Sequence, residues 1–342
     1  MSAYIRALAS YTPDRIVTND ELAQTVDTSD EWIQSHTGIR ERRIAPDDQA
    51  SSDLAVTAAN RVLTRAGVAP EDLSLIIVAT STPDYANFPS VASIVQDRIG
   101  AAHAGAFDLA AGCTGFVYAL EVARAMVAAG AAPGAAAPTA APAPTATKVL
   151  VIGSEVLTRI TNWDDRNSCV LFGDGAGAAI VDSGVPESGH EVLGSWLQSK
   201  GSGDTALIRP VGGTRTPYDP GRHTAADMTI HMDGRRVYLF AVDALVRSIE
   251  TLCHQHEIPV EDLDWIVPHQ ANARIIEAAA KRIGLPRERF YTNLDRYANT
   301  SAASIPIAMD EMQENGLLNA GEIVLTIGFG AGLSYGGNII RW

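Results

Sequence analysis

The sequence predicts a layered α/β fold made of two similar halves. Short, uninterrupted apolar runs are typical of strands that are buried on both faces of a sheet. Such runs occur in both halves of the chain: LIIVAT at 75–80, KVLVIG at 148–153, AGAAIV at 176–181, WIVP at 265–268, EIVLTIG at 322–328 and GNIIRW at 337–342. Segments of helical composition lie between these runs, at 52–66, 117–129 and 237–256. Strands that alternate with helices favour an architecture in which helices cover the faces of the sheets.

A weak internal repeat supports the division into halves. Three segments recur in the same order, at 70–80 and 260–270, at 107–115 and 293–301, and at 149–155 and 323–329. Collinear repeats are typical of a duplicated structural unit. We therefore expect an N-terminal half over 1–184 and a C-terminal half over 185–342, with the boundary in the stretch 183–189, which contains Gly, Pro and Ser.

An Ala/Pro/Thr tract interrupts the first half at 131–147. Its repeated prolines exclude a regular helix or a central strand. We expect an extended surface insert, and we assign it no catalytic role.

The composition indicates a globular protein and excludes general nucleic-acid binding. Apolar residues make up 46% and charged residues 19% of the 342 residues, and the formal net charge is −14. A nucleic-acid-binding protein needs a concentrated positive surface instead. We see neither an apolar stretch long enough to span a membrane nor an export signal. The 3 cysteines fit free thiols better than a disulfide framework, so we expect a cytoplasmic protein.

Cys113 is the candidate nucleophile. It lies in FDLAAGCTGF, where an apolar strand-like run and a small-residue turn lead into a helical segment. Backbone N–H groups and the helix dipole at such a turn favour an anion, which lowers the pKa of a thiol. The alternative is a small buried residue, because free cysteine is among the most buried residue types. That alternative is preferred for Cys169 and Cys253, whose contexts are a strand and a helix.

His269 is the candidate hydrogen-bonding partner. It ends an apolar strand after Pro268, which cannot continue a ladder, so the imidazole is displayed where α/β sheets present reactive groups. A neutral imidazole can donate a hydrogen bond to a developing oxyanion or accept a proton. His254 and His256 lie two residues apart on a helix and face different sides, so a metal pair is not expected.

Asn299 occupies, in the repeat, the place that Cys113 occupies in the first half. A two-fold relation between the halves would bring the two helix starts together. The segment NTSAAS is also an ordinary helix N-cap, and the repeat is what favours a functional role.

A glycine-rich tail, IGFGAGLSYGG at 327–337, is the remaining candidate site. Its glycines do not fit a dinucleotide-binding pattern, and it leads into a strand rather than a helix. A turn of this kind instead lets a backbone N–H approach a ligand closely, as an oxyanion hole requires. The similar GDGAGA at 173–178 lacks the Lys-Ser/Thr of a phosphate loop and is expected to pack at the junction of the halves.

Taken together, these motifs resemble β-ketoacyl-(acyl carrier protein) synthase III of the thiolase superfamily. The resemblance rests on AGCTGF around Cys113, PHQANAR around His269, NTSAASIP at Asn299 and the GFGAG tail, with DTSDEWI and TGIRER near the N-terminus. It covers nearly the full length, with 131–147 as an insert. The Cys/His/Asn combination separates this family from the elongating synthases, which use two histidines, and from thiolases, which use a second cysteine.

The resemblance implies a five-layered αβαβα fold, a homodimer and the first condensation of fatty-acid synthesis. Cys113 would attack an acyl-CoA thioester while the N–H groups of Cys113 and Ala331 hold the oxyanion. Decarboxylation of malonyl-acyl carrier protein would then give an enolate, held by His269 and Asn299, that attacks the acyl-cysteine. No metal or bound cofactor is implied, because acyl-CoA is itself a substrate.

The resemblance also implies substrate contacts. Trp32 and Arg166 would sandwich the adenine of CoA, while Thr28 and Asn272 would contact its pantetheine and nucleotide region. Phe88 would line the acyl pocket from across the dimer. The surface that binds the acidic carrier protein would consist of basic residues: Arg274, Arg235, Arg236, Lys281 and Arg282.

Three positions depart from the family pattern. His36 and Leu239 replace an arginine and a lysine expected to meet CoA or the carrier protein, and Ala331 replaces the middle glycine of the tail. The preferred starter is most simply acetyl. The departures leave open a specialised relative that uses an unusual starter or transfers the acyl group to oxygen or nitrogen. A non-enzymatic scaffold is the remaining alternative, and the presence of all three reactive residues argues against it.

Overall fold

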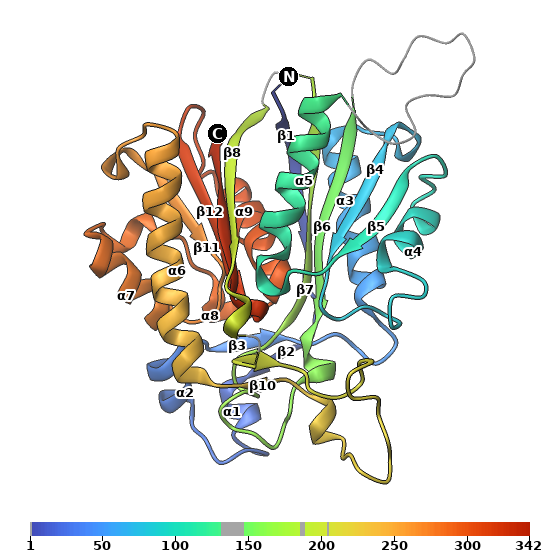
Figure 1. Cartoon of the computed structure of the whole chain (residues 1–342), viewed down its shortest axis with the longest axis vertical. Helices are drawn as coiled ribbons and strands as arrows, with labels where there is room; N and C mark the ends of the chain where they lie inside the picture. Colours follow the sequence, from blue (N-terminus) through green and yellow to red (C-terminus); the bar gives the residue numbers. More distant parts are fainter. Residues whose placement is uncertain (1, 131–146, 185–188, 204) are drawn as a thin grey trace.

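The computed structural model describes residues 2–130, 147–184, 189–203 and 205–342. Nine of its strands form one twisted, mixed sheet that divides into two half-sheets, and two further pairs of strands form small separate sheets (Figure 1). The expected insert at 131–147 lies almost wholly outside the described residues, as does most of the expected boundary at 183–189.

The two half-sheets repeat one strand order. The first runs β5-β4-β6-β7-β1, with these strands at Gly105–Leu109, Leu75–Ala79, Lys148–Val156, Asp174–Asp182 and Tyr4–Tyr11. The second runs β11-β12-β13-β8, with these strands at Trp265–Pro268, Ile323–Gly330, Ser334–Arg341 and His190–Ser199. In each half-sheet a parallel pair is followed by an antiparallel pair. The parallel pairs are β4–β6 in the first half-sheet and β11–β12 in the second. The antiparallel pairs are β6–β7 in the first and β12–β13 in the second. The strands β1 and β8 join the half-sheets through a short antiparallel contact at Tyr4 and Ile5.

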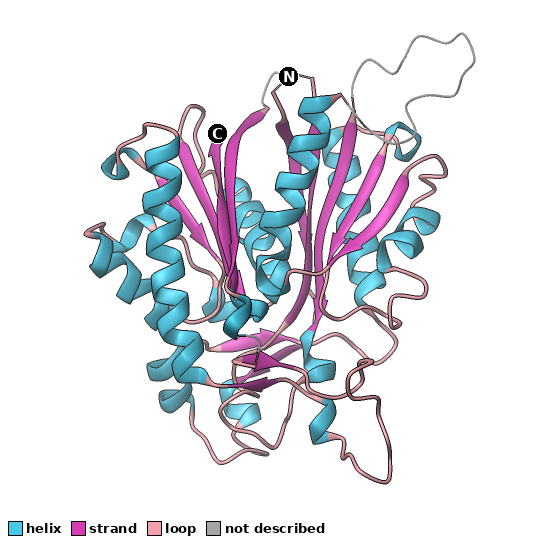
Figure 2. Cartoon of the chain, in the orientation of Figure 1, coloured by secondary structure: helices cyan, strands magenta, loops and turns pink. Residues whose placement is uncertain are grey.

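Helices complete five layers, αβαβα (Figures 1 and 2). Helices α3 (Ser51–Ala66) and α4 (Val91–Arg98) cover the outer face of the first half-sheet. Helices α6 (Gly234–Gln255) and α7 (Ala273–Ile283) cover the outer face of the second. Between the two half-sheets lie α5 (Gly115–Ala129) and α9 (Ser304–Glu314). The expected layered α/β fold is therefore confirmed.

Shorter elements gather at one end of the sheet, at the bottom of Figure 1. They are β2 (Ile16–Thr18), α1 (Asn19–Leu22), α2 (Asp30–Thr37), β3 (Glu41–Arg43), β9 (Leu207–Ile208), β10 (His231–Met232) and α8 (Leu294–Tyr297). Strands β4, β6, β11 and β12 all point toward this end, so their carboxyl ends meet there.

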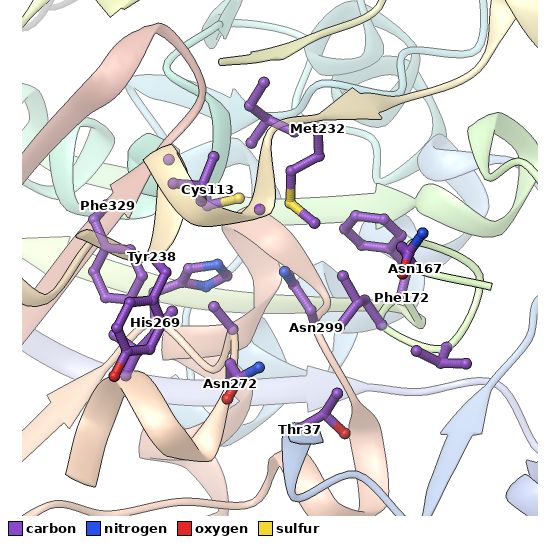
Figure 3. A pocket seen from close by; sticks show the side chains of 18 of the residues that line it. Thr37, Cys113, Asn167, Phe172, Met232, Tyr238, His269, Asn272, Asn299 and Phe329 are labelled. Carbon is purple, nitrogen blue, oxygen red and sulfur yellow. The ribbon is translucent and has the colours of Figure 1, made fainter. Parts of the chain in front are cut away.

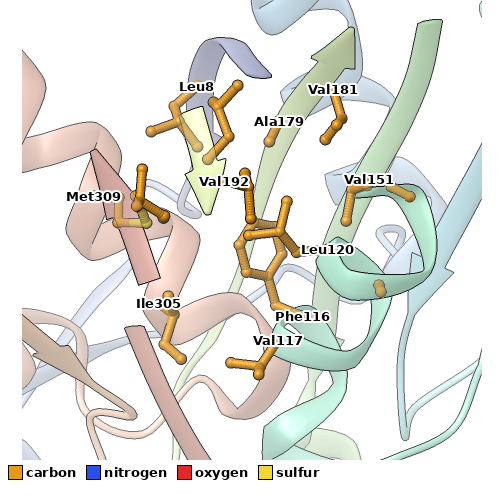
Figure 4. Close-up of a cluster of buried hydrophobic side chains, with 14 of the residues drawn as sticks. Leu8, Phe116, Val117, Leu120, Val151, Ala179, Val181, Val192, Ile305 and Met309 are labelled. Carbon is orange, nitrogen blue, oxygen red and sulfur yellow. The ribbon is translucent and has the colours of Figure 1, made fainter. Parts of the chain in front are cut away.

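The central layer is the main hydrophobic core (Figure 4). Phe116, Val117 and Leu120 of α5 are fully buried against Val151 and other strand residues. The segment Gly112–Ala129 is apolar and long enough to cross a membrane by length and composition alone, contrary to the sequence expectation. Its position between the two half-sheets identifies it instead as a core helix.

Glycine allows the central layer to lie very close to the strands. A Cβ atom at Gly153 of β6 would lie 2.2 Å from the carbonyl oxygen of Ala302, in the 3₁₀ turn η8 (Ser301–Ala303) that precedes α9. A Cβ at Gly177 of β7 would meet Pro306 of α9 at 2.7 Å. The GDGAGA segment thus packs against the second half, as expected.

Gly153→Ala is expected to destabilise the fold, because the new methyl group would force β6 and η8 apart. Overpacking costs about 1–3 kcal/mol, and here the clash is with backbone, so we expect a loss of at least about 2 kcal/mol in the free energy of unfolding. Urea denaturation measures it. Gly201→Ala is the control, because a Cβ there meets nothing within 4 Å. Equal stabilities of the two variants would contradict the close packing.

Candidate active site

Cys113 lies in η2 (Gly112–Thr114), the turn between β5 and α5. Gly112 adopts φ +54°, a left-handed conformation that glycine adopts without strain. The hydroxyl of Thr114 donates to the carbonyl oxygen of Ser334, 3.1 Å away, and so ties the turn to β13. The sequence thus folds into a strand–turn–helix unit whose thiol stands at the start of α5.

The glycine-rich tail approaches Cys113 from the second half of the sheet. A Cβ atom at Gly330 would lie 2.8 Å from the backbone nitrogen of Cys113, and one at Gly112 would lie 3.1 Å from the nitrogen of Ala331. Gly332 and Leu333 then turn the chain back with positive φ angles of 72° and 44°. The geometry therefore brings the backbone of Ala331 beside the turn that carries the thiol.

His269 follows the carboxyl end of β11 and is only 1% exposed. Its Nδ1 lies 2.7 Å from the hydroxyl of Ser304, and its ring lies in a T-shaped contact with the Phe329 ring, with the two ring centroids 5.2 Å apart. Burial lowers the pKa of His269 to about 3, so the imidazole is neutral across the working pH range.

Asn299 is held by backbone on both sides. Its N–H donates to the carbonyl of Leu171 and its carbonyl accepts from Gly173. Its side-chain Oδ1 accepts the N–H of Ser301 at 2.9 Å, which leaves the Nδ2 amide as the donor that this side chain can offer. Ala298 and Ser301 adopt positive φ angles of 56° and 47°. Such strain in residues other than glycine is typical of functional sites.

The internal repeat does not pair Cys113 with Asn299 as the sequence had suggested. Cys113 lies within η2, whereas Asn299 precedes η8, so element-by-element correspondence sets Ala302 opposite Cys113. The two side chains nevertheless line one cavity of about 230 Å³, together with His269 (Figure 3). Most other lining residues are apolar or aromatic, among them Val170, Leu171, Phe172, Val237, Tyr238, Phe240 and Phe329.

A buried carboxyl group lies behind the thiol. Glu155, at the end of β6, is fully buried and accepts hydrogen bonds from the Ser81 N–H, from Thr82 Oγ1 at 2.7 Å and from Ser301 Oγ at 2.9 Å. Burial raises the pKa of Glu155 to about 6. Burial also raises the pKa of the Cys113 thiol to about 12, and the charge of Glu155 adds to this, while the Ser301 hydroxyl acts against it. The helix start alone thus does not make this thiol acidic, contrary to the sequence expectation.

Only some of the residues expected to contact CoA are placed so that a ligand could reach them. Trp32 and Asn272 line the cavity. The guanidinium of Arg166 lies directly on the Trp32 ring, 4.3 Å from its centroid, so a purine between them requires Arg166 to move. Thr28 Oγ1 is buried and has no hydrogen-bond partner among the residues that the structure describes. The Asn272 side chain caps α7 by accepting the Arg274 N–H, and it also donates to the His36 carbonyl.

The expected carrier-protein contacts all lie on the surface of α6 and α7. These residues are exposed: Arg235, Arg236, Arg274, Lys281 and Arg282. Arg282 forms an ion pair with Asp243 at 3.1 Å. Leu239, 60% exposed, lies on the same helix as Arg235 and Arg236. Phe88 is 89% exposed and does not line the cavity of its own chain.

Sequence reasoning missed Glu155, Ser301 and Ser304. Glu155 carried a usable signal, because it is an acidic residue at the carboxyl end of a buried strand, as His269 is a basic one. Nothing in the local sequence marks the two serines. Among the described residues, no group of three or more His, Cys, Asp or Glu side chains is placed to hold a metal ion.

Glu155→Gln is expected to lower the pKa of the Cys113 thiol, because it removes a negative charge that opposes the thiolate. The pH profile of alkylation by iodoacetamide should move to lower pH. Ser301→Ala should move it to higher pH, because the hydroxyl that lowers the thiol pKa is lost. The variant Cys113→Ser is the control, because any alkylation that it still shows must occur at the other cysteines. Shifts of both profiles in one direction would contradict this electrostatic account.

Comparison with known proteins identifies the family. The family described as 3-oxoacyl-[acyl-carrier-protein (ACP)] synthase III matches residues 107–201, and its C-terminal domain matches residues 253–342. A β-ketoacyl-[acyl-carrier-protein] synthase III of Caldanaerobacter subterraneus is 48% identical over 100% of this chain and 98% of its own.

Solved structures of similar proteins indicate the same family. The β-ketoacyl-[acyl carrier protein] synthase III of Thermus thermophilus has a TM-score of 0.87 at 42% identity, over 99% of this chain and 98% of its own. A priming β-ketosynthase of a polyketide biosynthetic pathway has a TM-score of 0.86 at 33% identity, over 99% and 96% of the two chains. A likeness that runs through the whole fold shows that the chain belongs to the β-ketoacyl-(acyl carrier protein) synthase III family of condensing enzymes, whose members are acyltransferases of fatty-acid synthesis.

Proposed function

We propose that this condensing enzyme transfers a short acyl group, acetyl in the simplest case, from acyl-CoA to Cys113 and condenses it with malonyl-acyl carrier protein. The products are 3-ketoacyl-acyl carrier protein, CoA and CO2, and the reaction initiates fatty-acid synthesis. One observation carries the proposal: Cys113, His269 and Asn299 line a single, largely apolar cavity. This set needs no metal or bound cofactor, because the side chains supply the nucleophile and the donors.

In the loading step, the Cys113 sulfur attacks the thioester carbonyl. A bond forms between sulfur and carbon, the bond to the CoA sulfur breaks, and the thiol proton ends on the departing CoA. The N–H groups of Cys113 and Ala331 hold the oxyanion, and the start of α5 favours negative charge there. Because desolvation raises the pKa of the resting thiol, the donors that stabilise this transition state assist the attack.

In the condensation step, the malonyl group loses CO2 and leaves an enolate. Nε2 of His269 and Nδ2 of Asn299 donate to the enolate oxygen. The enolate carbon attacks the acyl group and expels the Cys113 thiolate, which takes up a proton from water to restore the thiol. Each such donor is worth about 3–4 kcal/mol in the transition state. The buried His269 is neutral, so it acts as a donor without a net charge.

The substrate contacts belong to the same proposal. Trp32 and Arg166 would separate to admit the adenine of CoA, beside Thr28 and Asn272. The exposed basic residues of α6 and α7 would bind the acidic carrier protein: Arg235, Arg236, Arg274, Lys281 and Arg282. Such soluble substrates agree with a cytoplasmic location.

We also propose a homodimer of chains with two duplicated halves, 1–184 and 185–342. The repeated strand order supports the halves. Strand β5 lies at the edge of the sheet with Phe107 38% exposed, and Phe88 is 89% exposed, so this edge offers apolar surface to a second chain. Phe88 would then line the partner's acyl pocket.

A specialised relative that primes with an unusual starter is the second candidate. It is favoured by exposed Leu239 on the proposed docking helix and by His36, whose ring stacks on Trp32 at 4.3 Å, where family members have basic residues. Intact mass spectrometry after exposure to acetyl-, isobutyryl- and aroyl-CoA decides between them. Efficient loading of acetyl-CoA supports the fatty-acid function, and loading of aroyl-CoA alone supports the second candidate.

Asn299→Ala is expected to separate the two steps. It should still form acyl-Cys113, because loading does not use the amide, but condensation should fall about 10²- to 10³-fold with the loss of one enolate donor. Mass spectrometry follows loading, and release of CO2 from malonyl-acyl carrier protein follows condensation. Asn167→Ala is the matched control, since Asn167 lines the same cavity at its exposed wall. Unchanged condensation in Asn299→Ala would remove Asn299 from the mechanism.

Sedimentation equilibrium is expected to give the mass of two chains. Phe88→Asp should weaken the dimer, because it places a charge in the proposed apolar contact. Tyr218→Asp is the control, since Tyr218 is 50% exposed on a loop outside this edge. A monomeric wild-type chain at assay concentration would contradict the dimer.

A further inference from the structure

We propose that Ser304 is a positioning residue that holds His269 in the neutral tautomer whose proton is on Nε2. The inference rests on the proposed role of His269 as an enolate donor, and it explains how this chain prepares that donor. Ser304 is the first residue of α9 and is 2% exposed.

The hydrogen-bond partners of the Ser304 hydroxyl indicate the direction of its bond to His269. The backbone N–H of Gln270 can only donate, and it points at Ser304 Oγ from 3.4 Å. The hydroxyl oxygen therefore acts as an acceptor toward Gln270. A hydroxyl oxygen can accept two hydrogen bonds, so the Gln270 contact alone does not decide how the hydroxyl meets the ring. Among the described residues, His269 Nδ1 at 2.7 Å is the acceptor within reach of the hydroxyl proton, and a buried hydroxyl proton needs an acceptor, so we infer that Ser304 donates to Nδ1. A hydroxyl that donates to Nδ1 requires the lone pair there, which leaves the ring proton on Nε2.

Burial makes the choice of tautomer decisive. His269 is 1% exposed and burial lowers its pKa to about 3, so a second ring proton is not available near neutral pH. Ser304 is the first residue of α9, so the positive end of the helix dipole lies close to His269 Nδ1. This positive end also disfavours a second proton on the ring, because the imidazolium would carry a like charge. The ring can thus donate to the cavity only from Nε2, and only while Nδ1 accepts.

Ser304 is itself held in place by its surroundings. It follows η8, which packs on Gly153 of β6, and its helix packs on β7 at Gly177 through Pro306. The T-shaped contact with the Phe329 ring restrains the imidazole from another side. The opposite tautomer would present a lone pair to the enolate oxygen, and in serine proteases a wrong histidine tautomer costs on the order of 10⁴ in rate.

Nitrogen-15 NMR of the full-length protein labelled at histidine reads the tautomer without turnover. His269→Gln assigns the His269 signals. We expect an Nε2–H, Nδ1-accepting ring in the wild type and a mixture of tautomers in Ser304→Ala. An Nδ1–H ring in the wild type, or an unchanged Nε2–H ring in Ser304→Ala, would overturn the proposal.

Kinetics supply the second test. Ser304→Ala should load acetyl groups at the wild-type rate and lose about tenfold or more in malonyl decarboxylation, and Ser304→Thr, which keeps the hydroxyl, should restore it. An equal loss in loading and decarboxylation would indicate a merely structural role and contradict the proposal. A wild-type enzyme that never condenses would overturn the proposed function instead, while the tautomer remains readable by NMR.

Discussion

The close approach of two helix starts to the sheet is the constraint on which the site depends. The chain can bring η2, η8 and the β12–β13 turn together only because glycines stand at the contacts. A Cβ at Gly115 would lie 2.9 Å from Ala79 Cβ, one at Gly330 would lie 2.8 Å from the Cys113 nitrogen, and one at Gly153 would lie 2.2 Å from the Ala302 oxygen. A single added methyl group at these positions would shift the backbone that carries the proposed catalytic groups, because protein interiors are close-packed.

This packing brings two proposed sets of hydrogen-bond donors to the cavity that Cys113 lines. Backbone N–H groups of η2 and of the glycine-rich turn lie on one side, and the side chains of His269 and Asn299 share the cavity with the thiol. A serine contacts each of the two proposed side-chain donors, since the Ser301 N–H donates to Asn299 Oδ1 and the Ser304 hydroxyl lies against His269 Nδ1. Preorganised donors of this kind stabilise charge as it develops, without reorganisation during the reaction. Successive oxyanions in the two steps can therefore use different donors.

The sequence predicted the layers, and it also singled out Cys113, His269 and Asn299, which line one cavity in the structure, because both inferences depend on local patterns. Apolar runs such as LIIVAT became buried strands, and the positions of Cys113 and His269 at the ends of strands followed from turn and proline signals. The electrostatics were not predictable. The acidic thiol expected at a helix start is opposed by burial and by Glu155, whose contact with the site runs through Ser301 from a distant region of the chain. The direct stacking of Arg166 on Trp32 likewise depends on tertiary geometry.

A crystal structure of the acetylated enzyme would test the central claim most directly. The claim is that the acyl oxygen and the enolate oxygen use separate donors around Cys113. It predicts that the acetyl oxygen on Cys113 accepts hydrogen bonds from the backbone N–H groups of Cys113 and Ala331, with Nε2 of His269 and Nδ2 of Asn299 left open to the cavity. An acetyl oxygen bound to His269 and Asn299 instead would contradict the account.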